Sequence, residues 1–209
     1  MIRRYIPENA RLLPEEAKKV FSGVIYDVYQ WQQRMFDGSY ETFEMLRRAD
    51  TVKILAILTD EEARQLKNVQ VSDEAGQKLL VTKQEQPRID CFYDYPGGRT
   101  DAEDADELAA AKRELLEETG LTMRNWRLVK AEQPFGKFDW LVYTFVATGL
   151  EGQTAQSLDA GEKIELEALS IAEVKKLTES DDARFMRFKE LSERISLDEL
   201  AEMPELHRY

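Results

Sequence analysis

One nine-residue run limits what this chain can fold into more than any other feature. It reads Arg-Glu-Leu-Leu-Glu-Glu-Thr-Gly-Leu over residues 113–121. The stretch before it favours a helix, because Thr100 with Glu103 three residues later fits a capping box, and Gly120 is a good residue to end a helix. A sharp break at Pro-Gly-Gly, residues 96–98, separates this helix from the preceding strands.

The predicted helix gathers three carboxylates on one side. At about 100° per residue, Glu117 lies roughly 60° to one side of Glu114, and Glu118 lies roughly 40° to the other. Like charges four residues apart mildly destabilise a helix, so a positive partner is expected. Mg²⁺ prefers oxygen ligands, and two ions about 3.5–4 Å apart can hold both oxygens of a displacement at phosphorus. A solvated acidic face is the alternative interpretation.

The composition excludes several classes of protein. The chain has 209 residues, with 29 Lys and Arg against 41 Asp and Glu, which gives a net charge of −12 and argues against a binder of duplex nucleic acid. Its 43% of hydrophobic residues is typical of a soluble globular protein. The apolar runs are too short to span a bilayer, and the N-terminus lacks the apolar core of a signal peptide. One cysteine, Cys91, lies in an apolar stretch, so we expect a reducing, cytoplasmic environment.

The pattern of elements predicts an α+β fold with a mixed sheet covered on both faces, preceded by a small N-terminal β unit. Strands are expected over residues 20–31, 42–48, 51–58, 78–83, 89–95, 126–131, 140–147 and 163–169, with later helices over 171–177 and much of 185–202. The expected parts are an N-terminal strand unit over 1–50, a catalytic domain over 51–178 and a C-terminal helical extension over 179–209.

The 113–121 run resembles the second half of the Nudix hydrolase signature at every fixed position, and Pro-Gly-Gly upstream is also typical of that family. The first half departs from the signature, because its glutamate would fall at Ala105 and its glycine at Arg99. Taking Gly98 as that glycine requires one inserted residue. Three possibilities stay open for the first acid: replacement by Asp104, displacement to Glu103, or absence.

The resemblance implies a Nudix-type α/β/α sandwich and a hydrolase that uses Mg²⁺ or Mn²⁺, with two or three ions. Glu114, Glu117 and Glu118 would be the metal ligands, helped by the backbone near Gly98. Arg113 resembles the family arginine that orients the glutamates by ion pairing.

The general base is a separate question. In the ADP-ribose pyrophosphatase branch a loop glutamate beyond the signature often serves, and the similar stretch over 158–165 makes Glu162 the first choice and Asp159 the second. A glutamate of the signature itself, Glu117 or Glu118, is the alternative.

The layout over most of the chain resembles the same branch, in which Glu-Gln-x-Arg, here residues 85–88, precedes the glycine turn. The resemblance implies ADP-ribose or another nucleoside diphosphate sugar as substrate, and a homodimer whose N-terminal strands contribute to the partner's site. A (d)NTP or dinucleoside polyphosphate hydrolase, or a non-catalytic nucleotide-sensing module, is the alternative. Candidate contacts for the substrate diphosphate are Arg48, Arg88 and Arg99, and the candidate aromatic contact for the base is Trp31. In the family, a proline about sixteen residues past the signature glycine is associated with ADP-ribose hydrolysis. The corresponding candidate here is Pro134, fourteen residues past Gly120.

Overall fold

A computed structural model describes residues 4–179 and 196–209 of the chain. The strands and helices follow each other along the chain in this order: β1 (Lys18–Ser22), β2 (Asp27–Arg34), β3 (Tyr40–Arg47), β4 (Thr51–Leu58), α1 (Asp60–Gln65), β5 (Val69–Val71), β6 (Lys78–Gln86), β7 (Ile89–Asp94), α2 (Glu107–Thr119), β8 (Leu121–Glu132), β9 (Phe138–Asp139), β10 (Val142–Gln153), β11 (Lys163–Leu169), α3 (Ile171–Thr178) and α5 (Leu197–Glu202). No helix in the described part of the chain is both long and apolar enough to cross a membrane.

The core is a mixed sheet of seven strands in the order β5-β11-β6-β4-β10-β8, with β7 paired to β6. β4 is parallel to β10 and antiparallel to β6. The β4–β6 pairing is confined to Ile57–Leu79 and Leu58–Lys78, at one end of β4. Along the rest of β4, the backbone amides of Val52 and Ile54 donate to the carbonyls of the turn at residues 96–98 instead, each at 2.9 Å. Because β4 and β6 are not paired there, the glycine turn can lie between them and pair with β4.

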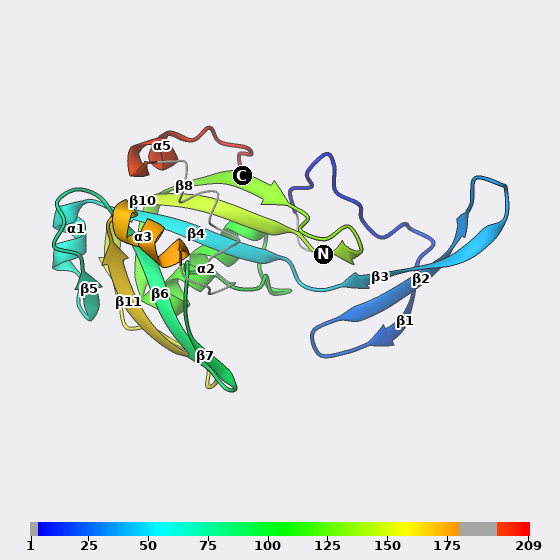
Figure 1. Cartoon of the computed structure of the whole chain (residues 1–209), viewed down its shortest axis with the longest axis horizontal. Coiled ribbons are helices and arrows are strands. Elements are labelled where there is room, and N and C mark those ends of the chain that lie inside the picture. The colour runs from blue at the N-terminus through cyan, green and yellow to red at the C-terminus, as the bar shows by residue number, and fades with distance from the viewer. Residues whose placement is uncertain (1–3, 180–195) are drawn as a thin grey trace.

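Helices cover both faces of this sheet (Figure 1). Leu115 of α2 packs in one buried cluster with Ile54 of β4. Val174 of α3 and Leu200 of α5 pack in another, with Leu55 of the same strand. Successive β4 residues therefore point to opposite faces, as a strand requires. The predicted α+β arrangement with a mixed sheet is confirmed.

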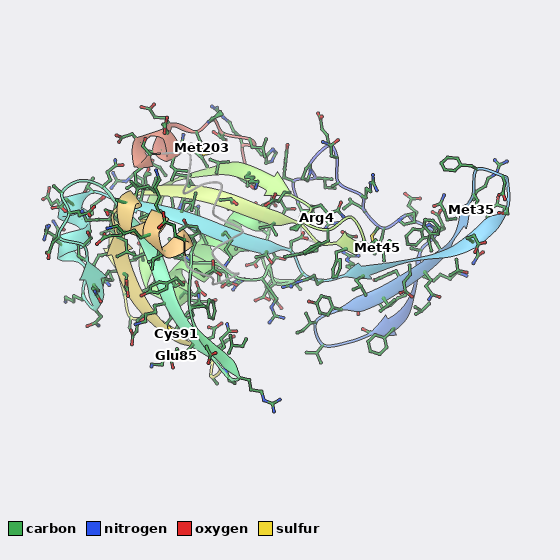
Figure 2. The ribbon with its side chains drawn as sticks, in the orientation of Figure 1. Arg4, Met35, Met45, Glu85, Cys91 and Met203 are labelled. Atoms are coloured by element: carbon green, nitrogen blue, oxygen red, sulfur yellow. The ribbon has the colours of Figure 1, made fainter. Side chains whose placement is uncertain are left out.

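A second sheet, β1-β2-β3-β9, projects from the core as an arm (Figure 1). β3 joins it to the rest of the molecule by pairing with β9, Leu46 opposite Phe138 and Arg47 opposite Asp139. Where the arm meets the core, Arg4 forms ion pairs with Asp50 at 3.0 Å and Asp139 at 2.9 Å (Figure 2). The arm carries exposed apolar side chains, namely Val20, Phe21, Phe36, Tyr40 and Phe43.

Two sequence-based expectations were wrong. Residues 20–31 are two strands, because Gly23 donates to the carbonyl of Tyr26 at 2.9 Å and closes a turn between β1 and β2. Helix α2 begins at Glu107 rather than near Thr100, because Asp106 caps it by accepting from the amide of Ala109.

Other expectations were incomplete. The short elements α1, β5 and β9 were not predicted, and most of the helix expected over 185–202 lies outside the described residues, which include its last part as α5.

Candidate active site

The C-terminal end of α2 is fixed by the loop between β10 and β11. Gly120 ends the helix at φ +74°, a conformation that suits glycine. The last carbonyls of a helix lack partners within it, and this loop supplies them. The donors and acceptors are Ser157 N to Glu117 O (2.9 Å), Gln156 Nε2 to Glu118 O (2.6 Å) and Thr154 N to Gly120 O (2.8 Å). The same loop carries Glu162 to the cleft in front of the helix.

The glycine turn lies directly against two helix glutamates. Glu118 Oε2 accepts a hydrogen bond from the backbone amide of Gly97 at 2.8 Å. A Cβ added at Gly98 would stand 2.5 Å from Glu114 Oε2, and one at Gly97 would collide with the backbone of Val52. Gly98 therefore leaves room for the Glu114 carboxylate, and Gly97 lets the turn approach the backbone of β4.

Arg113 ties the helix glutamates together. Its Nη1 donates to Glu114 Oε1 at 3.0 Å and to Glu117 Oε2 at 2.9 Å. Its Nε and Nη2 donate to the two oxygens of Asp104 at 3.1 and 3.0 Å, and Nη2 also donates to the carbonyl of Arg99 at 2.8 Å. The bidentate geometry with Asp104 fixes the plane of the guanidinium, and so fixes both glutamates.

Asp104 and Glu103 differ in a way that bears on the missing first acid. Asp104 is buried and ion-paired with Arg113, whereas Glu103 is exposed. Burial opposes ionisation of Asp104, but the hydrogen bonds from Arg113 and from the Asp101 amide, together with the charge of Arg113, outweigh it and lower its pKa. Of these two acids, Asp104 is the one that pairs with Arg113.

Two of the helix carboxylates are in an environment that penalises negative charge. Burial raises the pKa of Glu118 to about 8, although Lys53 opposes the shift. Burial also raises the pKa of Glu114 to about 7, against the effect of Arg113. Glu117 is more open, with 43% of its side chain exposed. A cation bound at the cleft would stabilise the ionised forms.

These groups line one cleft of about 760 Å³. Among the predicted site residues, the cleft is lined by Glu114, Glu117, Glu118, Arg113, Gly98, Glu162, Asp159, Arg48 and Arg99. The Arg48 guanidinium lies 4.8 Å from the ring of Trp140 and 5.8 Å from the ring of Tyr26.

Three of the predicted residues lie elsewhere. Arg88 is exposed in the turn between β6 and β7 with φ +67°. Trp31 lies on β2 in the arm, edge-on to Phe43 at 5.9 Å. Pro134 lies in the loop between β8 and β9. None of the three lines the cleft within one chain, and their contact with substrate stays a prediction.

The cleft also contains residues that sequence reasoning missed. Ile25 and Tyr26, from the turn between β1 and β2, reach it from the same chain. No local pattern marks them. Lys53 and Asp94 line it as well and form an ion pair at 2.7 Å. Lys53 could have been noticed, because it is the one charged residue in the apolar run over 51–58.

The carboxylates of α2 and the backbone of the glycine turn fit a divalent metal. Within residues 4–179 and 196–209, no group of three or more Asp, Glu, His or Cys side chains is close enough together to coordinate a metal as it stands. The fit rests on the position of two carboxylates against the glycine turn: that of Glu118, which is buried, and that of Glu114, whose side chain is 13% exposed. Arg113 holds Glu114 and Glu117 in this arrangement. Oxygen donors of this kind suit Mg²⁺ or Mn²⁺.

A comparison with protein-family models matches the NUDIX domain over residues 67–188, which is more than half of the chain. The chain belongs to the Nudix family. The protein is a Nudix hydrolase, and α2 with Gly120 after it carries the second half of the Nudix signature. No curated protein sequence matches the chain.

One of two similar solved structures shares the fold. A crystal structure of ADP compounds hydrolase is similar with a TM-score of 0.58 at 15% identity, covering 87% of this chain and 90% of that one. A structure of MutT, from a study of the psychrofile fish pathogen Aliivibrio salmonicida and the mesophile Vibrio cholerae, gives a TM-score of 0.46 at 18% identity, covering 70% and 96%. At such identities the first likeness shows a shared fold alone.

Proposed function

We propose that this Nudix hydrolase cleaves the diphosphate linkage of a nucleoside diphosphate sugar, ADP-ribose first among them, in an Mg²⁺-dependent reaction. The products are a nucleoside monophosphate and a sugar phosphate. The observation that carries the proposal is the convergence of Glu114, Glu117, Glu118 and Glu162 on one cleft, with two of these carboxylates cradled by the glycine turn.

Glu114, Glu117 and Glu118 would hold the metal, with the backbone at Gly98 beside them. Bound Mg²⁺ or Mn²⁺, in two or three ions, supplies positive charge to the diphosphate as negative charge develops on it. Arg113 keeps the carboxylates in place through the ion pairs it makes with two of them, so that little reorganisation is needed during the reaction.

Glu162 is the proposed general base. It lines the cleft, on a loop anchored to α2. Its negative charge helps to raise the pKa values of Glu114 and Glu118. A water between Glu162 and the diphosphate would give its proton to the carboxylate while its oxygen attacks phosphorus, and the bond to the bridging oxygen would break. Asp159 lines the cleft on the same loop and is the second choice.

Substrate recognition is proposed from the basic groups of the cleft. Arg48 and Arg99 line it, and their guanidinium groups match phosphate oxygens in shape and charge. The ring of Tyr26 near Arg48 offers an apolar surface to the rest of the substrate. The shared fold with ADP compounds hydrolase supports this class of substrate.

We also propose a cytoplasmic homodimer. In this proposal residues 1–50 are the dimerising unit, 51–178 the hydrolase domain and 179–209 a C-terminal extension. The support is the row of exposed apolar side chains on the arm, including Phe21 at 60%, Tyr40 at 63% and Phe43 at 41% exposure. Trp31, Arg88 and Pro134 would then contact substrate in the site of the assembled dimer.

The test is Mg²⁺-dependent hydrolysis of a panel: ADP-ribose, GDP-mannose, UDP-glucose, NADH, diadenosine polyphosphates and nucleoside triphosphates, with products identified by mass. Cleavage of ADP-ribose to AMP and ribose 5-phosphate supports the proposal. Preferential cleavage of a triphosphate or dinucleoside polyphosphate would overturn the substrate class. Nucleotide binding without turnover of any compound would overturn the assignment in favour of a sensing module.

A further inference from the structure

Lys53 is a largely covered charge in an apolar strand, at the edge of the cleft. It is the one charged residue of β4, whose next five residues, 54–58, are all buried and apolar. Its own side chain is 13% exposed. A lysine with so little of its side chain in water is costly unless other groups stabilise the ammonium, so its surroundings indicate why the strand tolerates it.

The ammonium is held at the cleft by the start of the glycine turn. Lys53 Nζ lies 2.7 Å from Asp94 Oδ2 and 3.4 Å from the carbonyl of Tyr95. Asp94 is fixed in turn, because its Oδ1 accepts from the amide of Tyr95 at 2.8 Å. A Cβ built at Gly97 would stand 3.0 Å from the Cα of Lys53, so the turn and the lysine backbone are in contact. The position of the ammonium is therefore set by the Asp94 carboxylate, which the Tyr95 amide holds, and by the Tyr95 carbonyl.

The charges around the cleft leave little positive charge for a substrate. Four basic side chains line the cleft, against seven acidic ones: Arg48, Lys53, Arg99 and Arg113, against Asp94, Asp101, Glu114, Glu117, Glu118, Asp159 and Glu162. Arg113 is committed to Asp104 and the helix glutamates. Arg99 has an exposed side chain, and Arg48 lies against aromatic rings. Lys53 is the basic group that the sheet itself supplies, beside Glu118.

We propose that Lys53 is a further catalytic residue, whose ammonium contacts a non-bridging oxygen of the substrate diphosphate from the sheet side of the cleft. The inference rests on the proposed function, because it needs a diphosphate in the cleft. The lysine would bind the diphosphate directly, in addition to any contact made through metal, and would stabilise the negative charge that builds on the phosphoryl oxygens. The pair with Asp94 keeps the ammonium oriented without a metal.

A purely structural role for Lys53 predicts something different. In that case the lysine only neutralises Asp94, and replacing both residues by neutral ones of similar size would restore function. Replacing Lys53 alone cannot separate the two roles, because it leaves an uncompensated carboxylate facing the substrate. The double variant Lys53→Met/Asp94→Asn removes both charges and separates them.

The experiment measures two quantities for the wild type, Lys53→Arg, Lys53→Met and the double variant. One is the affinity for a methylene-bridged ADP-ribose analogue, by calorimetry with Ca²⁺ and again with EDTA. The other is kcat/KM for ADP-ribose with Mg²⁺. We expect the double variant to bind the analogue about 10–100-fold more weakly with Ca²⁺ and also in EDTA, and to lose a similar factor in kcat/KM. Lys53→Arg keeps the charge and should recover most of both.

Each other result has a distinct meaning. A double variant that binds and turns over within about twofold of the wild type would overturn the inference and leave the proposed function standing. A loss of kcat/KM with unchanged analogue binding in EDTA would also overturn it, because direct contact does not depend on metal. Failure of the wild type to bind the analogue or cleave ADP-ribose would overturn the proposed function, and the inference with it.

Discussion

The cleft and the arm use side chains in opposite ways. In the cleft, charged groups are buried and fixed by backbone: Glu118 is 6% exposed and bonded to a glycine amide. In the arm, apolar groups are exposed, and Phe36 has no cover at all from the described chain. Burying charge and exposing hydrophobic surface both oppose stability, so each indicates a ligand or partner that compensates. The buried carboxylates of the cleft indicate a bound cation, and the exposed apolar side chains of the arm indicate contact with another apolar surface.

The largest effect is expected from Glu117→Gln. Removing one carboxylate from the metal-binding set should lower kcat by roughly 10²–10³-fold, because charge stabilisation of the transition state is lost. The fold should persist, since 43% of this side chain is exposed. Steady-state kinetics with circular dichroism checks both points, and near-wild-type turnover would remove Glu117 from the metal site.

A second, smaller effect is expected from Asp104→Asn. This change weakens the bidentate pair that orients Arg113, so kcat should fall by about 10–100-fold, as for other groups that support a metal ligand. Glu103→Gln is the matched control, because Glu103 is the exposed neighbour. Equal kinetics for the two variants would contradict a role for Asp104 in place of the first signature acid.

The sequence predicted the chemistry better than the shape of the site. The spacing of Glu114, Glu117 and Glu118 indicated one helix face, and the helix end at Gly120 was correctly located. The start of the helix was misplaced, because Thr100 and Asp106 are both reasonable caps and only tertiary contacts choose between them. Thr100 donates its amide to the carbonyl of Asp50 in the core instead.

Contacts distant in sequence could not be predicted at all. Tyr26 reaches the cleft only because the chain turns at Gly23 and because β3 pairs with β9. Both are tertiary events without a local signature. The sequence also could not decide whether Asp104 or Glu103 replaces the first signature acid, because this depends on which side chain is buried against Arg113.

The arm provides a prediction of a different kind. If it forms the dimer, Val20→Glu/Phe21→Glu should raise the dimer dissociation constant by about tenfold or more, because two apolar contacts become like-charge repulsion. These substitutions leave the ion pairs of Arg4 untouched, whereas deleting the N-terminal unit would not. Sedimentation velocity measures the change, and an unaltered dimer would place the interface elsewhere.

The smallest expected effect is on stability against pH. Glu114 and Glu118 have pKa values raised to about 7 and about 8 from an ordinary 4.5, so the metal-free folded chain binds more protons than the unfolded chain between about pH 4.5 and 8. Its stability therefore falls as pH rises through that window. Mg²⁺ should then raise Tm by a few degrees more at pH 8.5 than at pH 5.5. Calorimetric melts with Mg²⁺ and with EDTA measure this, and a metal effect independent of pH would contradict it.

The central claim is that the α2 glutamates and the glycine turn form a divalent metal site. Mn²⁺ binding followed by electron paramagnetic resonance tests it most directly, on the wild type, Glu117→Gln, Glu118→Gln and the control Glu103→Gln. We predict that the wild type and the control bind Mn²⁺ alike, and that both signature variants bind it at least about tenfold more weakly. Equal Mn²⁺ affinity in all four proteins would contradict the account.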